Sequence, residues 1–186
     1  MGILIFYIFF GVCFICYAIR TSYYVLANRG SELAENKRFI TILFVVMFIL
    51  WFAWFFIAFN DPYKMNLPSW ARYTGLALFI IGFFFFIFSH VKIRGQETDK
   101  LVTTGIYSKI RHPMYFGFII WIIGFPIFTN AAFTLAYAII WIPQILYWRM
   151  SEERQLVKKY KDYAEYKKTD VVLIDCVCFL SQLKKF

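Results

Sequence analysis

Five long apolar blocks alternate with shorter polar segments along the chain. Almost every residue within the blocks is uncharged, and a membrane-spanning helix needs roughly 20 such residues. The blocks cover residues 3–19, 39–59, 70–91, 114–128 and 131–148. The pattern therefore predicts an all-α integral membrane protein with five transmembrane helices.

The fourth and fifth blocks are separated by little more than Asn130. At 1.5 Å per residue, the fourth block would rise only about 22 Å. We therefore expect a tight antiparallel hairpin that stops short of the far surface or thins the bilayer around it. The first block lacks a basic segment before it and a small-residue cleavage site, so we interpret it as a helix rather than a signal peptide.

Composition supports the membrane assignment. Of the 186 residues 61% are hydrophobic, whereas soluble domains have about 45–50%. The net charge of +9 is confined to the segments between blocks, which indicates a basic membrane face and excludes nucleic acid as a partner.

We expect a single membrane domain over residues 1–186. The four cysteines do not form a tetrahedral metal set, so we predict no metal site.

The basic residues also predict an orientation. All of the 20 Lys and Arg residues, except Lys64 and Arg72, follow the first, third or fifth block. Cytoplasmic loops carry an excess of Lys and Arg. This places the N-terminus outside and the C-terminus in the cytoplasm. The membrane would be the plasma membrane of a prokaryote or the endoplasmic reticulum of a eukaryote.

A polar stretch of about 20 residues, from Lys92 to Arg111, joins the third and fourth blocks. Thr103-Thr104-Gly105 indicates a turn. The apolar pairs Leu101-Val102 and Ile106-Tyr107 could lie beneath a bound adenine-sized ring. The alternative is a solvated connector, although long loops in compact domains are often functional.

Arg111-His112-Pro113 directly precedes the fourth block. Proline suits the first turn of a helix, which places His112 at its N-cap. Free backbone N–H groups there favour a bound anion. The motif therefore predicts a rim that holds a cofactor carboxylate or a phosphate. The alternative is an interfacial histidine beside a snorkelling arginine and a helix-starting proline.

The polar residues after the fifth block predict a second, amphipathic helix that runs to about Lys168. Leu156, Tyr160 and Tyr163 recur at spacings of four and three, which gives one apolar stripe. Such a helix would lie on the membrane surface or over the loop.

Arg149, Glu152 and Glu153 stand where the fifth block ends. A carboxylate here could bind a ribose diol or an amino group, and Arg149 could hold a substrate carboxylate at the membrane edge. The alternative is structural, with Ser151 as an N-cap and both acids in the first turn of the amphipathic helix.

The ordered motifs of this region resemble those of the isoprenylcysteine carboxyl methyltransferases, and the related phospholipid N-methyltransferases share the same general pattern. The resemblance covers roughly residues 92–168. The motifs that carry it are Leu101-Val102-Thr103-Thr104-Gly105-Ile106-Tyr107, Arg111-His112-Pro113-Met114-Tyr115-Phe116-Gly117, Glu152-Glu153 with Leu156, and Tyr163 with Tyr166-Lys167-Lys168.

The resemblance implies a membrane methyltransferase that uses S-adenosylmethionine and releases S-adenosylhomocysteine. Its cofactor-binding half would be about residues 90–170, and Arg149 would position the carboxylate of a lipid-like, prenylcysteine-type substrate that enters from the bilayer. The implied cofactor contacts are Lys92, Asp99, Lys100, Leu101, Val102, Tyr107, His112, Pro113, Met114, Tyr115, Glu152 and Glu153.

Three other functions remain open from the sequence. A phospholipid amine substrate would have to lose a proton before attack, so Glu152 or Glu153 would be needed as a base. An NADPH-dependent sterol-type reductase would also pair an Arg-His motif with a charged C-terminal segment. A non-enzymatic membrane adaptor would use the basic face alone.

Overall fold

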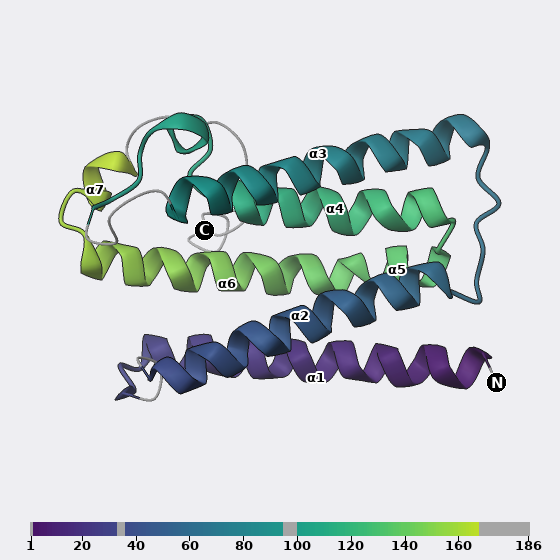
Figure 1. Ribbon diagram of the computed structural model, residues 1–186, viewed down its shortest axis with the longest axis horizontal. Helices are drawn as coiled ribbons and strands as arrows, with labels where there is room; N and C mark the ends of the chain where they lie inside the picture. The colour runs from purple at the N-terminus through teal and green to yellow at the C-terminus, as the bar shows by residue number, and fades with distance from the viewer. Residues whose placement is uncertain (1, 33–35, 95–99, 168–186) are drawn as a thin grey trace, which may run out of the picture.

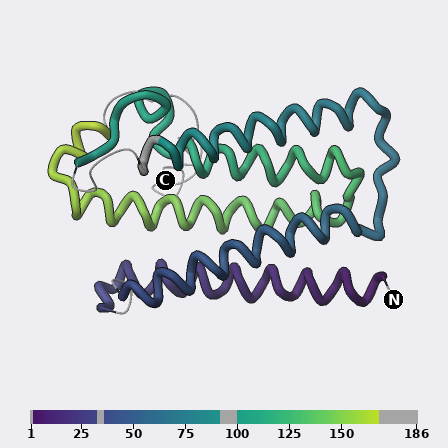
Figure 2. The backbone as a smooth tube through the Cα atoms, viewed as in Figure 1, coloured from purple at the N-terminus to yellow at the C-terminus, as the bar shows by residue number. Residues whose placement is uncertain are grey.

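The computed structural model describes residues 2–32, 36–94 and 100–167 (Figures 1 and 2). Asp99 and the side chain of Lys92, both predicted cofactor contacts, lie outside the described atoms. The described residues are helical, without a named strand. The elements are α1 Gly2–Asn28, α2 Lys37–Phe59, α3 Ser69–Arg94, η2 Gly105–Ser108, α4 Pro113–Thr129, α5 Ala132–Ala136, α6 Ala138–Lys159 and α7 Tyr163–Tyr166.

The long helices run up and down side by side (Figure 1). Helix α3 packs along α4, α1 packs along α2, and α6 lies between the two pairs. The C-terminal ends of α1, α3 and α6 therefore meet the start of α4 at one end of the bundle. Three helices, Gly2–Asn28, Lys37–Phe59 and Ser69–Val91, are long and apolar enough to cross a membrane, and Pro113–Thr129 is a shorter apolar helix. The protein is thus a multi-pass membrane protein whose described part is built from helices.

Polar contacts hold the opposite end of the bundle together. Asn130 ends α4 in the left-handed conformation, with φ of 58°, and its side chain accepts the backbone N–H of Leu67 at 3.1 Å. The buried Asp61 carboxylate accepts the backbone N–H of Thr134 at 2.7 Å, its hydroxyl at 2.8 Å, and the N–H of Tyr63 at 2.9 Å. These bonds join the α2–α3 connection to the turn between α4 and α5. The predicted hairpin is present, and this turn is its tip.

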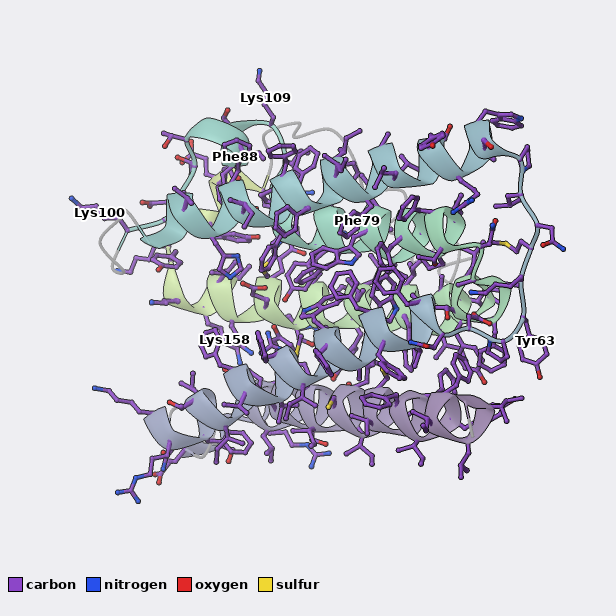
Figure 3. The ribbon with its side chains drawn as sticks, turned by 45° about the vertical axis from the view of Figure 1, so that its right-hand side comes forward. Tyr63, Phe79, Phe88, Lys100, Lys109 and Lys158 are labelled. Carbon is purple, nitrogen blue, oxygen red and sulfur yellow. The ribbon has the colours of Figure 1, made fainter. Side chains whose placement is uncertain are left out.

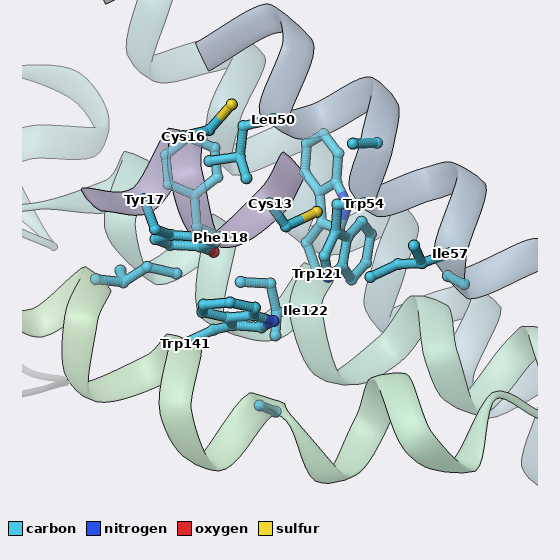
Figure 4. Packing of buried hydrophobic residues seen from close by; sticks show 14 of the residues in the cluster. Cys13, Cys16, Tyr17, Leu50, Trp54, Ile57, Phe118, Trp121, Ile122 and Trp141 are labelled. Carbon is cyan, nitrogen blue, oxygen red and sulfur yellow. The ribbon is translucent and has the colours of Figure 1, made fainter. Parts of the chain in front are cut away.

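The core between the helices is mainly aromatic (Figure 4). The ring of Tyr17 on α1 stacks on Trp141 of α6, with centroids 4.1 Å apart and planes 4° from parallel. Trp54 of α2 lies against Phe125 of α4 at 5.6 Å. Because such rings bury large areas with defined geometry, they fix α6 against α1 and α2 against α4.

Two predicted boundaries were wrong. The fifth apolar block is not one helix, because α5 ends at Ala136 and α6 begins at Ala138. No separate amphipathic helix begins near Ser151 either: α6 continues to Lys159, and Ser151 is buried inside it. The helix ends there because Tyr160 takes an extended conformation, with φ of −118° and ψ of 116°.

Candidate functional site

The α3–α4 loop forms one wall of a site at the basic end of the bundle. Gly105, with φ of 68°, permits the turn that the sequence predicted, and the short helix η2 follows it. This turn places the Tyr107 side chain inward, where it is buried. Burial raises the pKa of the Tyr107 phenol to about 12, although a hydrogen bond with Ser89 opposes the shift. Tyr107 therefore stays neutral and serves as a partly apolar wall.

The start of α4 forms the floor of the site. His112 is the N-cap and Pro113 the first helical residue, which confirms the predicted place of this motif at the start of the helix. The His112 side chain makes no capping bond, so it does not occupy the backbone N–H groups of the first turn. Burial, followed by the charges of Arg149, Arg111 and Lys167, lowers the pKa of His112 to about 3. The imidazole is therefore neutral at physiological pH.

The C-terminal part of α6 supplies the acidic residues, which point in different directions. Glu152 lines the cavity described below. Glu153 lies 3.8 Å from Arg149, one turn earlier on α6, and 3.3 Å from the Nζ of Lys167. The two carboxylates are consequently not equivalent: Glu152 faces the site and Glu153 is held in an ion-paired cluster beside it.

The segment after α6 folds back over the loop. Tyr166 donates a hydrogen bond to the backbone carbonyl of Tyr107, and the Tyr163 hydroxyl lies 3.4 Å from Nε2 of His112. Arg111 donates to the carbonyl of Lys167 at 2.9 Å. Helix α7 therefore covers the loop, which is one of the two placements predicted for the amphipathic helix. It is only a single short turn (Figure 1).

These elements enclose a cavity of about 220 Å³. A wider, open hollow of about 850 Å³ adjoins it and shares Lys100, Leu101, Tyr160 and Tyr166. Lys100 lies at this end of the bundle in Figure 3. The smaller cavity is lined by Lys100, Leu101, Val102, Tyr107, Arg111, His112, Pro113, Met114, Tyr115, Glu152, Leu156, Tyr160, Tyr163 and Tyr166.

Most of the predicted cofactor contacts are thus brought to one cavity. Glu153 is the exception among the described side chains, since it is not a lining residue of this cavity. Arg149, which was predicted to position the substrate, does not line it either. Arg149 is close enough to the lining residue His112 to lower its pKa, and Glu153 lies 3.8 Å from Arg149. Both residues therefore stand directly beside the cavity. The stretch that contains His112 and the stretch that contains Glu152 meet across the hairpin.

Sequence reasoning missed part of the wall. Tyr160, Tyr163 and Tyr166 line the cavity, whereas the first two were interpreted only as the apolar stripe of an interfacial helix. Their tyrosine hydroxyls were the available signal, because a stripe that only touches lipid does not need them.

Helix α1 also reaches this end of the bundle, and its role was missed altogether. Its polar residues make bonds to α6 and α4: Asn28 donates to Ser151 at 3.1 Å, and the Tyr24 hydroxyl is 2.9 Å from that of Tyr115. Arg20, Tyr24 and Asn28 recur every four residues near the C-terminal end of α1, and this polar spacing was the signal.

Comparison with known proteins identifies the family. The model of the phospholipid methyltransferase family matches residues 70–163, half of the chain. The chain belongs to this family.

Curated relatives are named as isoprenylcysteine methyltransferases. The chain is 36% identical over 83 residues to protein-S-isoprenylcysteine O-methyltransferase B of Arabidopsis thaliana, covering 42% of each chain. It is 36% identical over 84 residues to protein-S-isoprenylcysteine O-methyltransferase of Schizosaccharomyces pombe, covering 44% of this chain and 36% of the relative. The matched region thus spans less than half the length of these relatives. No solved structure matches the chain significantly.

Proposed function

We propose that this protein is an S-adenosylmethionine-dependent methyltransferase that methylates the carboxylate of a lipid-like, prenylcysteine-type substrate. One observation carries the proposal: His112, Tyr115 and Glu152, from two separate stretches of the chain, line a single cavity at the basic end of a membrane bundle. The relatives' names, protein-S-isoprenylcysteine O-methyltransferases, support the substrate class.

The proposed topology has five spans, with the N-terminus outside and the C-terminus in the cytoplasm. The up-and-down arrangement supports it, since the basic segments after α1, α3 and α6 all emerge at the same end (Figure 1). Lysines concentrated at this end would face the negatively charged cytoplasmic leaflet. In this orientation the cavity opens towards the cytosol, from which a polar cofactor would enter.

The donor set of the cavity fits the proposed cofactor. Glu152 could accept hydrogen bonds from ribose hydroxyl or amino groups. The N–H groups at the start of α4 suit a carboxylate, and the neutral His112 adds no charge that would repel a sulfonium. Leu101, Val102 and Leu156 provide apolar surface for a purine. Lys92 and Asp99 remain proposed contacts, and Glu153 a proposed contact from the adjoining cluster.

The cofactor supplies an electrophilic methyl group on a sulfonium. A terminal carboxylate has a pKa of about 3.3–3.7, so it is already ionised at neutral pH and this chain needs no general base. Arg149 would hold the carboxylate at the membrane edge by charge-assisted hydrogen bonds. The tyrosine-covered walls would exclude water, which favours a reaction in which opposite charges are neutralised.

A phospholipid amine is the second candidate substrate. The observation that favours it is the pKa of Glu152, which burial raises although the Tyr115 hydrogen bond and the Arg20 charge oppose the shift. A carboxyl with a raised pKa is better suited to accept a proton from an amine. A pH–rate profile separates the two: a flat rate between pH 6 and 8 supports the carboxylate, and a steep rise supports the amine.

The cofactor assignment is tested by calorimetry. We expect the detergent-solubilised, folded protein to bind S-adenosylhomocysteine and not NADPH. Binding of NADPH alone would support a reductase instead. Binding of neither, by a protein with a cooperative thermal unfolding transition, would favour a non-enzymatic adaptor.

A further inference from the structure

A chain of hydrogen bonds leads from the first helix to the cavity. On α1, the Arg20 Nη2 donates to the Tyr24 hydroxyl at 2.9 Å, and this hydroxyl lies 2.9 Å from that of Tyr115 on α4. Tyr115 lines the same cavity as Glu152 of α6, and hydrogen bonding by its hydroxyl lowers the pKa of the Glu152 carboxyl. Arg20 and Tyr24 stand outside residues 70–163, the part of the chain that matches the family model.

The donors in this chain can be assigned from chemistry. Arginine only donates hydrogen bonds and an ionised carboxylate only accepts them. Tyr115 has one hydroxyl hydrogen, which it gives to Glu152, so the hydrogen between the two tyrosines belongs to Tyr24. Tyr24 therefore accepts from Arg20 and donates to Tyr115. Every bond points towards Glu152, and each polarises the next.

The network is held rigidly. Tyr24 and Tyr115 are each 3% exposed. The Arg20 guanidinium lies 4.8 Å from the centre of the Tyr24 ring and 5.9 Å from that of Trp148 on α6. Cation–aromatic contacts of this kind restrict the side chain and offset part of its desolvation. Arg20 therefore has little freedom to move away from the tyrosine.

We propose that Arg20 and Tyr24 are positioning residues that hold Glu152 through Tyr115. The relay would fix the direction of the carboxylate and keep it ionised, which leaves its remaining lone pairs for a hydroxyl or amino group of the ligand. The identity of that ligand rests on the proposed function, whereas the relay itself does not. The first helix would then complete a site that the family-matched segment only partly builds.

The titration of Glu152 gives a direct measure of the relay. Burial raises the pKa of this carboxyl, while the Tyr115 bond and the Arg20 charge lower it. Cutting the relay should therefore raise the pKa further. The titratable or charged groups that act on Glu152 include Arg20 and Tyr24 from α1, Tyr115 from α4, Tyr107 from η2 and Tyr163 from α7. Lining the same cavity are also Lys100, Arg111, His112, Tyr160 and Tyr166.

The first experiment needs no ligand. The carboxyl infrared band that Glu152→Gln removes is titrated with pH in the full-length protein without cofactor. We expect its midpoint to rise in Tyr24→Phe and in Arg20→Met. Tyr23→Phe is the matched control, because it removes a neighbouring hydroxyl that is not part of the relay. An unchanged midpoint in both relay variants, or an equal rise in the control, would overturn the proposal.

The second experiment measures S-adenosylhomocysteine binding by calorimetry at neutral pH. Tyr24→Phe should weaken binding by about three- to tenfold. In a Glu152→Gln background the same substitution should not weaken binding further, because the effects of substitutions within one network are not additive. A full additional loss in that background would contradict the relay. If the wild-type protein does not bind S-adenosylhomocysteine at all, the proposed function fails, and the infrared titration still decides the relay.

Discussion

Gly82 on α3 and Gly117 on α4 pack backbone against backbone. A Cβ atom on Gly82 would come within 2.6 Å of the Gly117 carbonyl oxygen, and a Cβ on Gly117 within 2.5 Å of the Gly82 carbonyl oxygen. Gly75 and Gly124 repeat the contact one heptad away, at 2.7 Å in each direction. Small residues at this spacing allow membrane helices to approach closely. The pair sets the position of α4, whose first turn is the floor of the cavity.

Gly117→Ala should therefore destabilise the protein. The backbone cannot give way as a flexible side chain could, so we expect a loss of about 1–3 kcal/mol from overpacking. Thermal unfolding in detergent measures it. Gly11→Ala on α1 is the matched control, because nothing lies within 4 Å of a Cβ there. Equal unfolding temperatures for the two variants would contradict the close approach of α3 and α4.

The glycine contacts illustrate what the sequence could and could not predict. The hydrophobic blocks predicted the long helices, because the length and apolarity of a segment are local properties. The seven-residue spacing of Gly75 and Gly82, matched by Gly117 and Gly124, marks a face of each helix but does not name its partner. Packing partners depend on the whole bundle, so the spacing alone did not predict them.

The same distinction applies to the site. His112 and Pro113 were predicted at the start of α4 because proline preference is local. The break after Lys159 was missed, because the side chains beyond it are held by tertiary bonds to the loop, such as that from Tyr166 to Tyr107. Helix α1 carried no family motif; its polar spacing marks a face, but which residues Tyr24 contacts depends on how the helices pack.

The neutral state of His112 predicts how stability depends on pH. Its folded pKa of about 3 lies below its ordinary value of 6.5. Below about pH 6.5 the unfolded chain therefore binds a proton that the folded chain does not, and stability falls as the pH falls towards 3. At pH 5 this cost is about 2 kcal/mol. His112→Gln should lose correspondingly less stability between pH 7 and pH 5, measured by denaturant unfolding.

His90→Gln is the control for that experiment, since it removes the other histidine of the chain. If the two variants have the same pH dependence as the wild type, His112 is not the buried neutral group that the structure describes. A larger loss in His112→Gln than in the wild type would have the wrong sign for a lowered pKa and would also refute this prediction.

Asp61 anchors the end of the bundle opposite the cavity. Its carboxylate accepts three hydrogen bonds, two of them from Thr134. Asp61→Ala would leave these buried donors unsatisfied, and we expect a destabilisation of about 2–4 kcal/mol. Thr134→Val removes only the hydroxyl bond and should cost less. S-adenosylhomocysteine binding by the folded fraction should be unchanged, because the site lies at the other end of the helices.

Arg149 separates substrate positioning from cofactor binding. It lies one turn before Glu153, 3.8 Å from that carboxylate, beside the cavity rather than in its lining. We expect Arg149→Ala to lower methyl transfer by about 100-fold or more, because a misaligned reactant loses much of the benefit of orientation. The dissociation constant of S-adenosylhomocysteine should change by less than about threefold. Arg154→Ala, an exposed arginine on the same helix, should change neither quantity. Equal losses of transfer and binding in Arg149→Ala would instead assign this residue to the cofactor or to the fold, and would remove the argument that it aims the carboxylate.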